Sequence, residues 1–352
     1  MRSPHAHAAV VGIDTATALT SSGVVDLLTA ADLPGQLCSG PIRADRPVLA
    51  AGVVRHVGEP VAAVLATDPV SATRAAWAVA VEYRPLPEVS WFRGEQADPL
   101  HPDGNVLRSV RVRRGDPLPA LDWSDRDVFD PDAREPIRSP LAGADLVVDG
   151  GYGTHGWQPR SEPFGVDGMP AVPAVIQVQP TDEGVRIAAP RRWQPSERDQ
   201  LAQCLGLTPR QIELTSTGVH DHSIDLGGAV VAATFARRNH RPVCLLVGPP
   251  MFGQGGGPMM GLRYRHHARW DGTLVAVQAE IDLAAGPYAG LAEAVIAEFC
   301  AVGVGPYRVP AVDLRVRAVR STTPPPMLEP GLAAAVVAFA VEAQLDRLAD
   351  RL

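Results

Sequence analysis

The stretch Ile212–Phe235, IELTSTGVHDHSIDLGGAVVAATF, decides the fold because it has the pattern of a strand, a polar loop and a helix in immediate succession. The β-forming residues at its start predict a short strand, and the small apolar residues at its end predict a helix packed on a sheet. Gly227 and Gly228 open that helix, allow close approach of its backbone and leave N–H groups available to an anion.

The loop between this strand and this helix carries the best candidate chemistry in the chain. We predict His220, Asp221, His222 and Asp225 to be catalytic, with an aspartate setting the tautomer of an imidazole that acts as general acid or base. Two histidines two residues apart could also bind a divalent ion together with Asp225 or Glu162, although we predict no metal site. A solvated loop in which Asp225 merely caps the helix is the third interpretation.

Composition limits the class of protein. The 352 residues are 46% hydrophobic with a net charge of −7, which indicates a globular, mildly acidic protein and argues against nucleic acid as a partner. No apolar run is long enough to span a membrane, and the first residues do not resemble a signal peptide. The scattered cysteines are typical of free thiols in a reducing compartment, so we expect a cytoplasmic protein. All 32 basic residues are arginines, which excludes a Schiff-base or P-loop lysine.

Three regions follow one another along the chain. Residues 1–87 alternate strand and helix patterns and predict a small α+β domain. Residues 88–144 are rich in Pro, Asp and Arg with weak periodicity, and predict an extended, packed connector. Residues 145–352 predict a second, larger domain of strands and helices.

Local signals place several elements. Asp68 followed by Pro69 predicts a helix start, and a short helix is expected within 24–31. A helix over 195–205 should end at Gly206, a hairpin should turn at Asp271-Gly272, and a long helix should run from 331 to 352.

The order of several motifs resembles the molybdenum hydroxylase large-subunit family, which includes xanthine dehydrogenase, aldehyde oxidase and carbon monoxide dehydrogenase. The motifs are RSPHAHA (2–8), GEPVAAV (58–64), VEY with LP (81–87), DGGY (149–152), EP (162–163) and GPYRVP (305–310). The resemblance implies an α+β fold: an a/b hammerhead domain followed by the first half of an aldehyde oxidase/xanthine dehydrogenase-type molybdopterin-binding domain. It also implies that the second half, with most cofactor contacts, lies outside this chain.

The sequence departs from that family where the resemblance would place the cofactor. The family's glycine-rich loop corresponds to GVHDHSIDLGG at 218–228, so bulky side chains replace glycines that would approach the metal. The family's substrate-side arginine corresponds to about Glu329. From the resemblance and the loop we predict a set of substrate-binding residues: Glu162, Arg191, Arg192, Trp193, Gly227, Gly228 and Glu329. The arginines and the tryptophan would bind an anionic or planar molecule by pairing and stacking.

Three functions remain open at this point. The favoured hypothesis is a homologue that has lost molybdopterin, has no cofactor and performs acid–base chemistry (isomerisation, cyclisation, elimination or hydrolysis) on a small organic molecule. The alternative is a subunit of a split oxidoreductase that retains molybdopterin, with a partner chain supplying the second half. The third is a non-catalytic binding or scaffold protein. A homo-oligomer is compatible with each.

Overall fold

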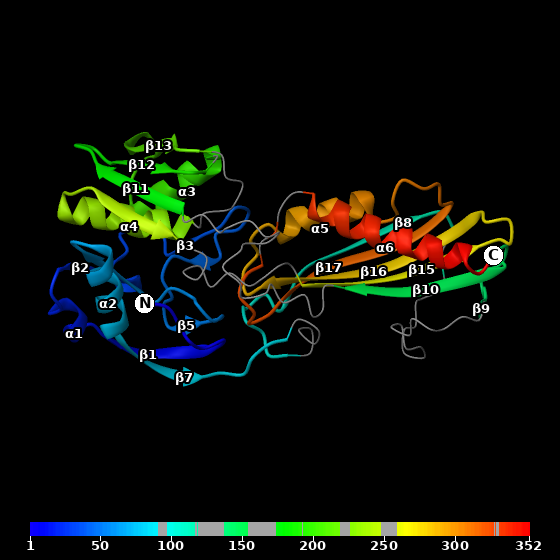
Figure 1. The fold of residues 1–352 in the computed structure, drawn as a ribbon, viewed down its shortest axis with the longest axis horizontal. Helices are drawn as coiled ribbons and strands as arrows, with labels where there is room; N and C mark the ends of the chain where they lie inside the picture. Colours follow the sequence, from blue (N-terminus) through cyan, green and yellow to red (C-terminus); the bar gives the residue numbers. More distant parts are fainter. Residues whose placement is uncertain are drawn as a thin grey trace.

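The computed structural model describes residues 1–90, 97–116, 118, 137–153, 174–191, 193–218, 226–247, 259–326, 328 and 331–352. Three layered parts make up the molecule (Figure 1). They are an N-terminal α+β module, a four-stranded sheet with two helices, and a six-stranded sheet with two further helices on one face.

The N-terminal module combines a three-stranded sheet in the order β5-β1-β7 with the antiparallel pairs β2-β6 and β3-β4. Asp68 caps α2 by accepting the Ser71 N–H at 2.9 Å, which confirms the predicted helix start. The elements in order are β1 (Ala8–Asp14), α1 (Ala16–Leu19), β2 (Val24–Thr29), η1 (Ala30–Asp32), β3 (Cys38–Ser39), β4 (Arg46–Pro47), β5 (Val53–Val54), β6 (Ala62–Ala66), α2 (Pro69–Ala78) and β7 (Ala80–Pro85).

The expected helix within 24–31 is wrong. Residues Val24–Thr29 form strand β2, and only a single 3₁₀ turn, Ala30–Asp32, follows. Pairing with β6 buries Leu27 and Leu28, so a long-range contact overrides the helical preference of the local sequence.

The four-stranded sheet has the order β13-β12-β11-β14, in which only β12 and β13 are parallel. Helix α3 runs from Pro195 to Leu205 and ends at Gly206 in the left-handed conformation, as predicted. The elements are β11 (Ala174–Pro180), β12 (Val185–Ala189), α3, η4 (Pro209–Gln211), β13 (Ile212–Ser216), α4 (Leu226–Asn239) and β14 (Val243–Val247).

Helix α4 is buried nearly all round, which explains the apolar character of the sequence after Gly228. One side packs on the sheet, and the other meets Leu28, Leu33 and Val48 of the N-terminal module within one hydrophobic core. The N-terminal module and the four-stranded sheet therefore share a core.

The six-stranded sheet has the order β8-β17-β16-β15-β10-β9, and its β15–β16 hairpin confirms the predicted turn. The four-stranded layer is inserted between β10 and β15, which are neighbours in this sheet. The elements are β8 (Val106–Arg114), β9 (Ile137–Arg138), β10 (Leu146–Gly153), β15 (Met260–Ala268), β16 (Leu274–Gly286), α5 (Ala292–Val302), β17 (Ala311–Arg320) and α6 (Leu332–Ala349).

Strand β8 lies in the segment expected to be an extended connector. It pairs antiparallel with β17 over most of its length, and Arg111 forms two hydrogen bonds to Asp313 across the pair. Alternating valine and arginine in VRVRR fits an edge strand with one solvated face. None of the helices in the described part of the chain combines the length and the hydropathy needed to cross a membrane.

Candidate functional site

The parallel pair β12–β13 brings two predicted site segments to one edge of the four-stranded sheet. Ala188 lies opposite Thr215 and Ala189 opposite Ser216, so both strands end together. The carbonyl of Ala189 accepts the N–H groups of Arg191 at 2.8 Å and Thr217 at 2.9 Å. The segment that leads to α3 and the segment that leads to α4 therefore start side by side at the carboxyl ends of the strands, where α/β sheets commonly bind ligands.

Arg191 forms a buried ion pair within the fold. Its guanidinium donates two hydrogen bonds to Glu197 in the first turn of α3, and the two side chains are only 13% and 4% exposed. Glu197 Oε2 also accepts the Gln194 N–H at 2.9 Å, which completes a capping box. This pair fixes the segment before α3, so a substrate-binding role for Arg191 remains a prediction that would require exchange of its carboxylate partner.

Trp193 is held against the same edge. Its indole N–H donates to the Thr215 carbonyl at 3.1 Å, and the Arg191 guanidinium lies 5.6 Å from the ring centroid. This cation–π contact orients the indole. The predicted stacking of a planar substrate on Trp193 remains a prediction.

Gly228 serves packing at the start of α4. A Cβ atom there would lie 3.2 Å from Leu245 Cδ2 and 3.3 Å from Ile176 Cδ1, so a side chain would fit only if these two neighbours shifted by a few tenths of an ångström. Gly227, the other predicted anion-binding glycine, is also buried. The structure thus packs Gly228 closely against these two side chains, and anion binding by the N–H groups of the glycine pair stays a prediction.

The remaining predicted site residues lie outside the described residues: His220, Asp221, His222 and Asp225, and also Glu162, Arg192 and Glu329. Within the ranges that are described, no group of three or more His, Cys, Asp or Glu side chains is placed to hold a metal ion.

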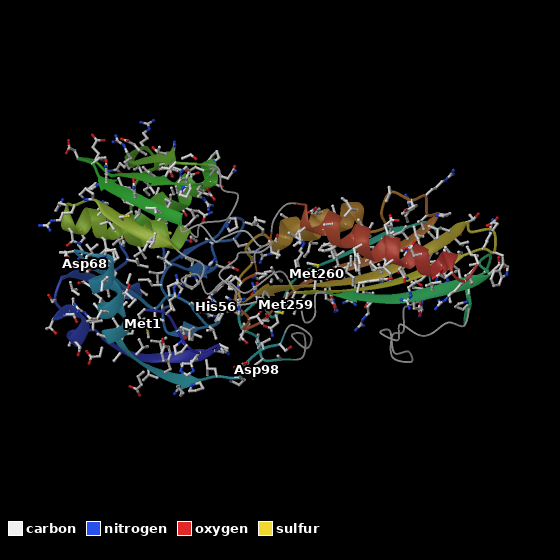
Figure 2. All side chains as sticks on the ribbon, in the orientation of Figure 1. Met1, His56, Asp68, Asp98, Met259 and Met260 are labelled. Carbon is white, nitrogen blue, oxygen red and sulfur yellow. The ribbon has the colours of Figure 1, made fainter. Side chains whose placement is uncertain are left out.

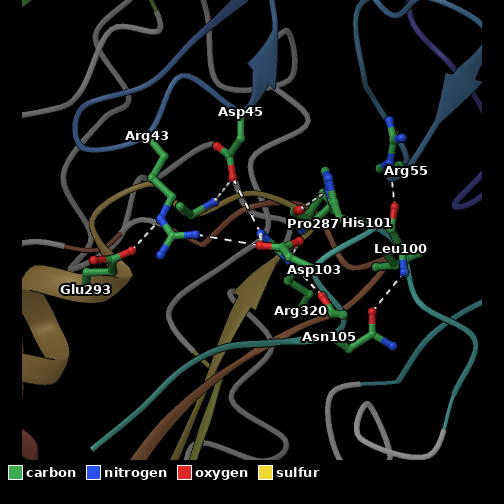
Figure 3. A network of polar contacts seen from close by, with 12 residues as sticks. Arg43, Asp45, Arg55, Leu100, His101, Asp103, Asn105, Pro287, Glu293 and Arg320 are labelled. Atoms are coloured by element: carbon green, nitrogen blue, oxygen red, sulfur yellow. Dashed lines mark hydrogen bonds and ion pairs between the residues drawn. The ribbon is translucent and has the colours of Figure 1, made fainter.

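Sequence reasoning missed a second polar cluster, which joins the N-terminal module to the six-stranded sheet (Figure 3). Arg320, at the end of β17, is 2% exposed and donates to both carboxylate oxygens of Asp103, at 2.5 and 3.1 Å, and to the Gly104 carbonyl. Asp45 accepts the Ala289 N–H at 2.9 Å and lies 4.0 Å from Arg320. We call this cluster the junction network.

The second part of the junction network is a buried carboxyl–phenol pair. Tyr288 O–H donates to Glu59 Oε1, while Glu59 Oε2 accepts the Arg55 N–H at 2.5 Å. Burial raises the pKa of the Glu59 carboxyl, and burial together with Glu59 raises the pKa of Tyr288. Figure 2 labels the buried His56 beside this region, in the middle of the molecule. The sequence signal that could have indicated this pair is Glu59, the one charged residue of the motif GEPVAAV.

His101 gives the junction network a pH dependence. Its Nε2–H donates to the Pro287 carbonyl at 2.8 Å, and burial, aided by the charges of Arg320 and Arg55, lowers its pKa to about 4. Because the folded pKa lies below the ordinary 6.5, the unfolded chain takes up this proton first. Stability from His101 is therefore complete above pH 6.5 and is lost as the pH falls towards 4.

We expect His101→Gln to flatten this loss of stability. Chemical unfolding measured at intervals between pH 7 and 4 should show a shallower decline in the variant, whereas Glu59, whose raised pKa acts in the opposite direction, is unchanged in both proteins. His240→Gln, at an exposed position, sets the baseline. An identical decline in His101→Gln and the parent would contradict the assignment.

Two family models match the chain. The a/b hammerhead domain of aldehyde oxidase and xanthine dehydrogenase matches residues 1–87, and the molybdopterin cofactor-binding domain matches residues 165–352, more than half of the chain. The fold class predicted from the sequence is therefore confirmed.

Relatives align with the chain from end to end. A Bacillus subtilis (strain 168) protein named as a probable xanthine dehydrogenase subunit is 27% identical over 100% of this chain and 45% of its own length. The nicotinate dehydrogenase large molybdopterin subunit of Eubacterium barkeri is 25% identical over 100% of this chain and 78% of its own length. An aldehyde oxidoreductase structure from Desulfovibrio gigas superposes with a TM-score of 0.81 and 24% identity, over 99% of this chain and 38% of its own, and so establishes the fold alone.

Proposed function

The chain belongs to the molybdenum hydroxylase large-subunit family of aldehyde oxidases and xanthine dehydrogenases, and from that membership we propose that it is one half of a split hydroxylase. The other molybdopterin-binding half would be a separate chain, accompanied by flavin and iron–sulfur proteins. The complex would hydroxylate a small aldehyde or heterocycle.

The match to most of the E. barkeri molybdopterin subunit is the observation that carries this proposal. The chain aligns along its whole length with the B. subtilis relative, yet spans only 45% of that protein. The E. barkeri molybdopterin subunit aligns over nearly the same number of residues, which make up 78% of its length, so a family member much shorter than the B. subtilis protein exists.

The described residues do not by themselves form a cradle for molybdopterin. At the shared sheet edge, Arg191 is paired with Glu197, and the space beside Gly228 is filled by Leu245 and Ile176. We therefore assign most cofactor contacts to the partner chain and derive no chemical step from this chain alone. The match to the molybdopterin cofactor-binding family supports retention of the cofactor by the complex.

A second candidate follows from the loop sequence GVHDHSIDLGG. Titratable side chains stand where the family has glycines, and this loop starts beside the segment of Arg191 and Trp193. Without a cofactor, His220, Asp221, His222 and Asp225 would transfer protons to and from a small organic substrate. Under a purely binding role, the double variant His220→Ala/His222→Ala would keep full function.

Purification of the tagged chain from its native host separates these candidates. The split-hydroxylase proposal expects one partner chain per copy, with a sequence that matches the part of the relatives this chain lacks. A homogeneous preparation that converts a small molecule alone, and loses that activity in the His220→Ala/His222→Ala variant, would replace the proposal with the acid–base candidate.

A further inference from the structure

Two cysteines that are far apart in the sequence meet where strand β3 packs against α3. The thiol of Cys204, in the last turn of α3, donates to the Cys38 carbonyl at 3.5 Å, although 166 positions separate the two residues. The other two cysteines lie in different elements, Cys244 on β14 and Cys300 on α5, and all four are free thiols. The fold, and not the local sequence, therefore creates the pair of Cys38 and Cys204.

Hydrogen bonds on both sides of Cys38 hold its segment against α3. The Gln36 N–H donates to the Gln203 carbonyl at 2.9 Å. Gln200 exchanges two hydrogen bonds with the backbone of Gly40, at 2.8 and 2.6 Å. Cys38 lies midway between these two anchor points, so its distance from α3 is set by its neighbours on either side.

The two sulfur atoms are within reach of each other. Because a carbonyl oxygen lies about 2.4 Å from the Cα atom of its own residue, the Cys204 sulfur lies within about 6 Å of Cys38 Cα. A disulfide places its two Cα atoms about 4.4–6.8 Å apart. Strand β3 is only two residues long, so a small shift of its backbone disturbs few ladder contacts. Rotation of both side chains together with such a shift can bring the sulfurs to bonding distance.

The two thiols differ in their access to solvent, which gives each a separate role. Cys38 is half-buried, whereas Cys204 is fully buried in the core that the N-terminal module shares with the four-stranded sheet. A dissolved oxidant therefore reacts first at Cys38. Cys204 can react only with a group that is already attached to Cys38.

We propose that Cys38 and Cys204 close to a disulfide that ties the N-terminal module covalently to α3, with a small disulfide such as oxidised glutathione as the oxidant. The Cys38 thiolate attacks one sulfur of the oxidant, forms a mixed disulfide and releases one thiolate. The Cys204 thiolate then attacks the Cys38 sulfur, forms the internal disulfide and releases the second thiolate. Two protein thiols are oxidised, one small disulfide is reduced to two thiols, and the two cysteine protons pass to these thiols.

The bond acts on the helix that supports the candidate site. The first turn of α3 holds the Arg191–Glu197 pair, and the new bond fixes the last turn of the same helix. The bond also closes a long loop of chain, which restricts the unfolded state more than the folded one. The inference holds for either candidate function, since no cofactor takes part in the reaction.

The surroundings of Cys38 make the reaction slow at neutral pH. Burial raises the pKa of its thiol, as do the charges of Asp45 and Glu59, while the charge of Arg55 lowers it. Burial, together with the charge of Cys38, raises the pKa of Cys204 to about 11. Because only the thiolate attacks, the rate of closure should rise about ten-fold for each pH unit between pH 7 and 9.

The test uses the full chain, incubated with excess oxidised glutathione at pH 8 and digested without reduction. Mass spectrometry should find one linked peptide pair that joins Cys38 to Cys204 and is lighter than the two thiol peptides by two hydrogen atoms. The double variant Cys244→Ser/Cys300→Ser is the control and should form the same link at the same rate. Cys204→Ser should instead stop at a glutathione adduct on Cys38, because its hydroxyl cannot displace the glutathione.

Unfolding in urea supplies an independent readout. Closure of a loop of this length should raise the unfolding midpoint by about 1 M, and dithiothreitol should reverse the rise. Oxidised Cys204→Ser should show no rise. An oxidised parent without the linked peptide, a link between other cysteines, or the same stable glutathione adduct with and without Cys204 would overturn the pair. An unchanged midpoint in the closed chain would overturn the tie between the module and α3.

Discussion

Gly35→Ala is expected to lower the free energy of unfolding by about 3 kcal/mol, at the upper end of what overpacking costs. A Cβ atom at Gly35 would lie 2.1 Å from the Gln203 carbonyl oxygen and 2.8 Å from that of Cys204. Both contacts are with backbone at the end of α3, so no side-chain rotation can relieve them. The loop would have to move away from the four-stranded layer.

The contacts beside Gly35 show what that movement would break. The Gln36 N–H donates to the Gln203 carbonyl at 2.9 Å, and Gln200 exchanges two hydrogen bonds with the backbone of Gly40. Gly12→Ala is the matched control, because a Cβ atom at Gly12 meets nothing within 4 Å. Chemical denaturation should separate the two variants clearly; equal midpoints would mean that the N-terminal module does not dock on α3 in this way.

Glu197→Ala should cost about 3 kcal/mol, because it removes the carboxylate that accepts two hydrogen bonds from the mostly buried Arg191 guanidinium. It also removes the acceptor for the Gln194 N–H at the start of α3. Glu213→Ala breaks another Arg–Glu pair of the same sheet, with Arg186, whose side chains are 52% and 54% exposed. Exposed pairs contribute about 0.5 kcal/mol, so this control should be nearly neutral.

The same pair of variants has a functional readout in the assembled complex. Loosening the segment before α3 in Glu197→Ala would displace Trp193 from the shared sheet edge, so activity per complex should fall at temperatures where the variant remains folded. A Glu197→Ala complex with full activity and unchanged stability would show that the Arg191–Glu197 pair does not fix this edge.

Local signals in the sequence predicted the elements whose ends are set by neighbouring residues. Asp68 caps α2, and Gly206 ends α3 in a conformation that glycine adopts readily. The strand and the helix predicted after Ile212 are confirmed as β13 and α4. The register that places β13 beside the strand before Arg191 depends on a parallel pairing that no local motif encodes.

Elements that depend on distant strand partners were not predicted from the sequence. Strands β2 and β8 exist because β6 and β17 lie beside them, and helical or irregular local patterns concealed both. The junction network joins Glu59 to Tyr288 and Asp103 to Arg320 across more than 200 residues of chain. The predicted catalytic residues, His220, Asp221, His222 and Asp225, lie outside the described residues and remain predictions.

The most direct test of the split-hydroxylase account is the molybdenum and pterin content of the chain purified alone and together with its partner. The account predicts about one molybdenum and one pterin per pair of chains, and neither in the chain alone. A cofactor-free pair, or a chain that acts on a small molecule with neither partner nor molybdenum, would contradict it.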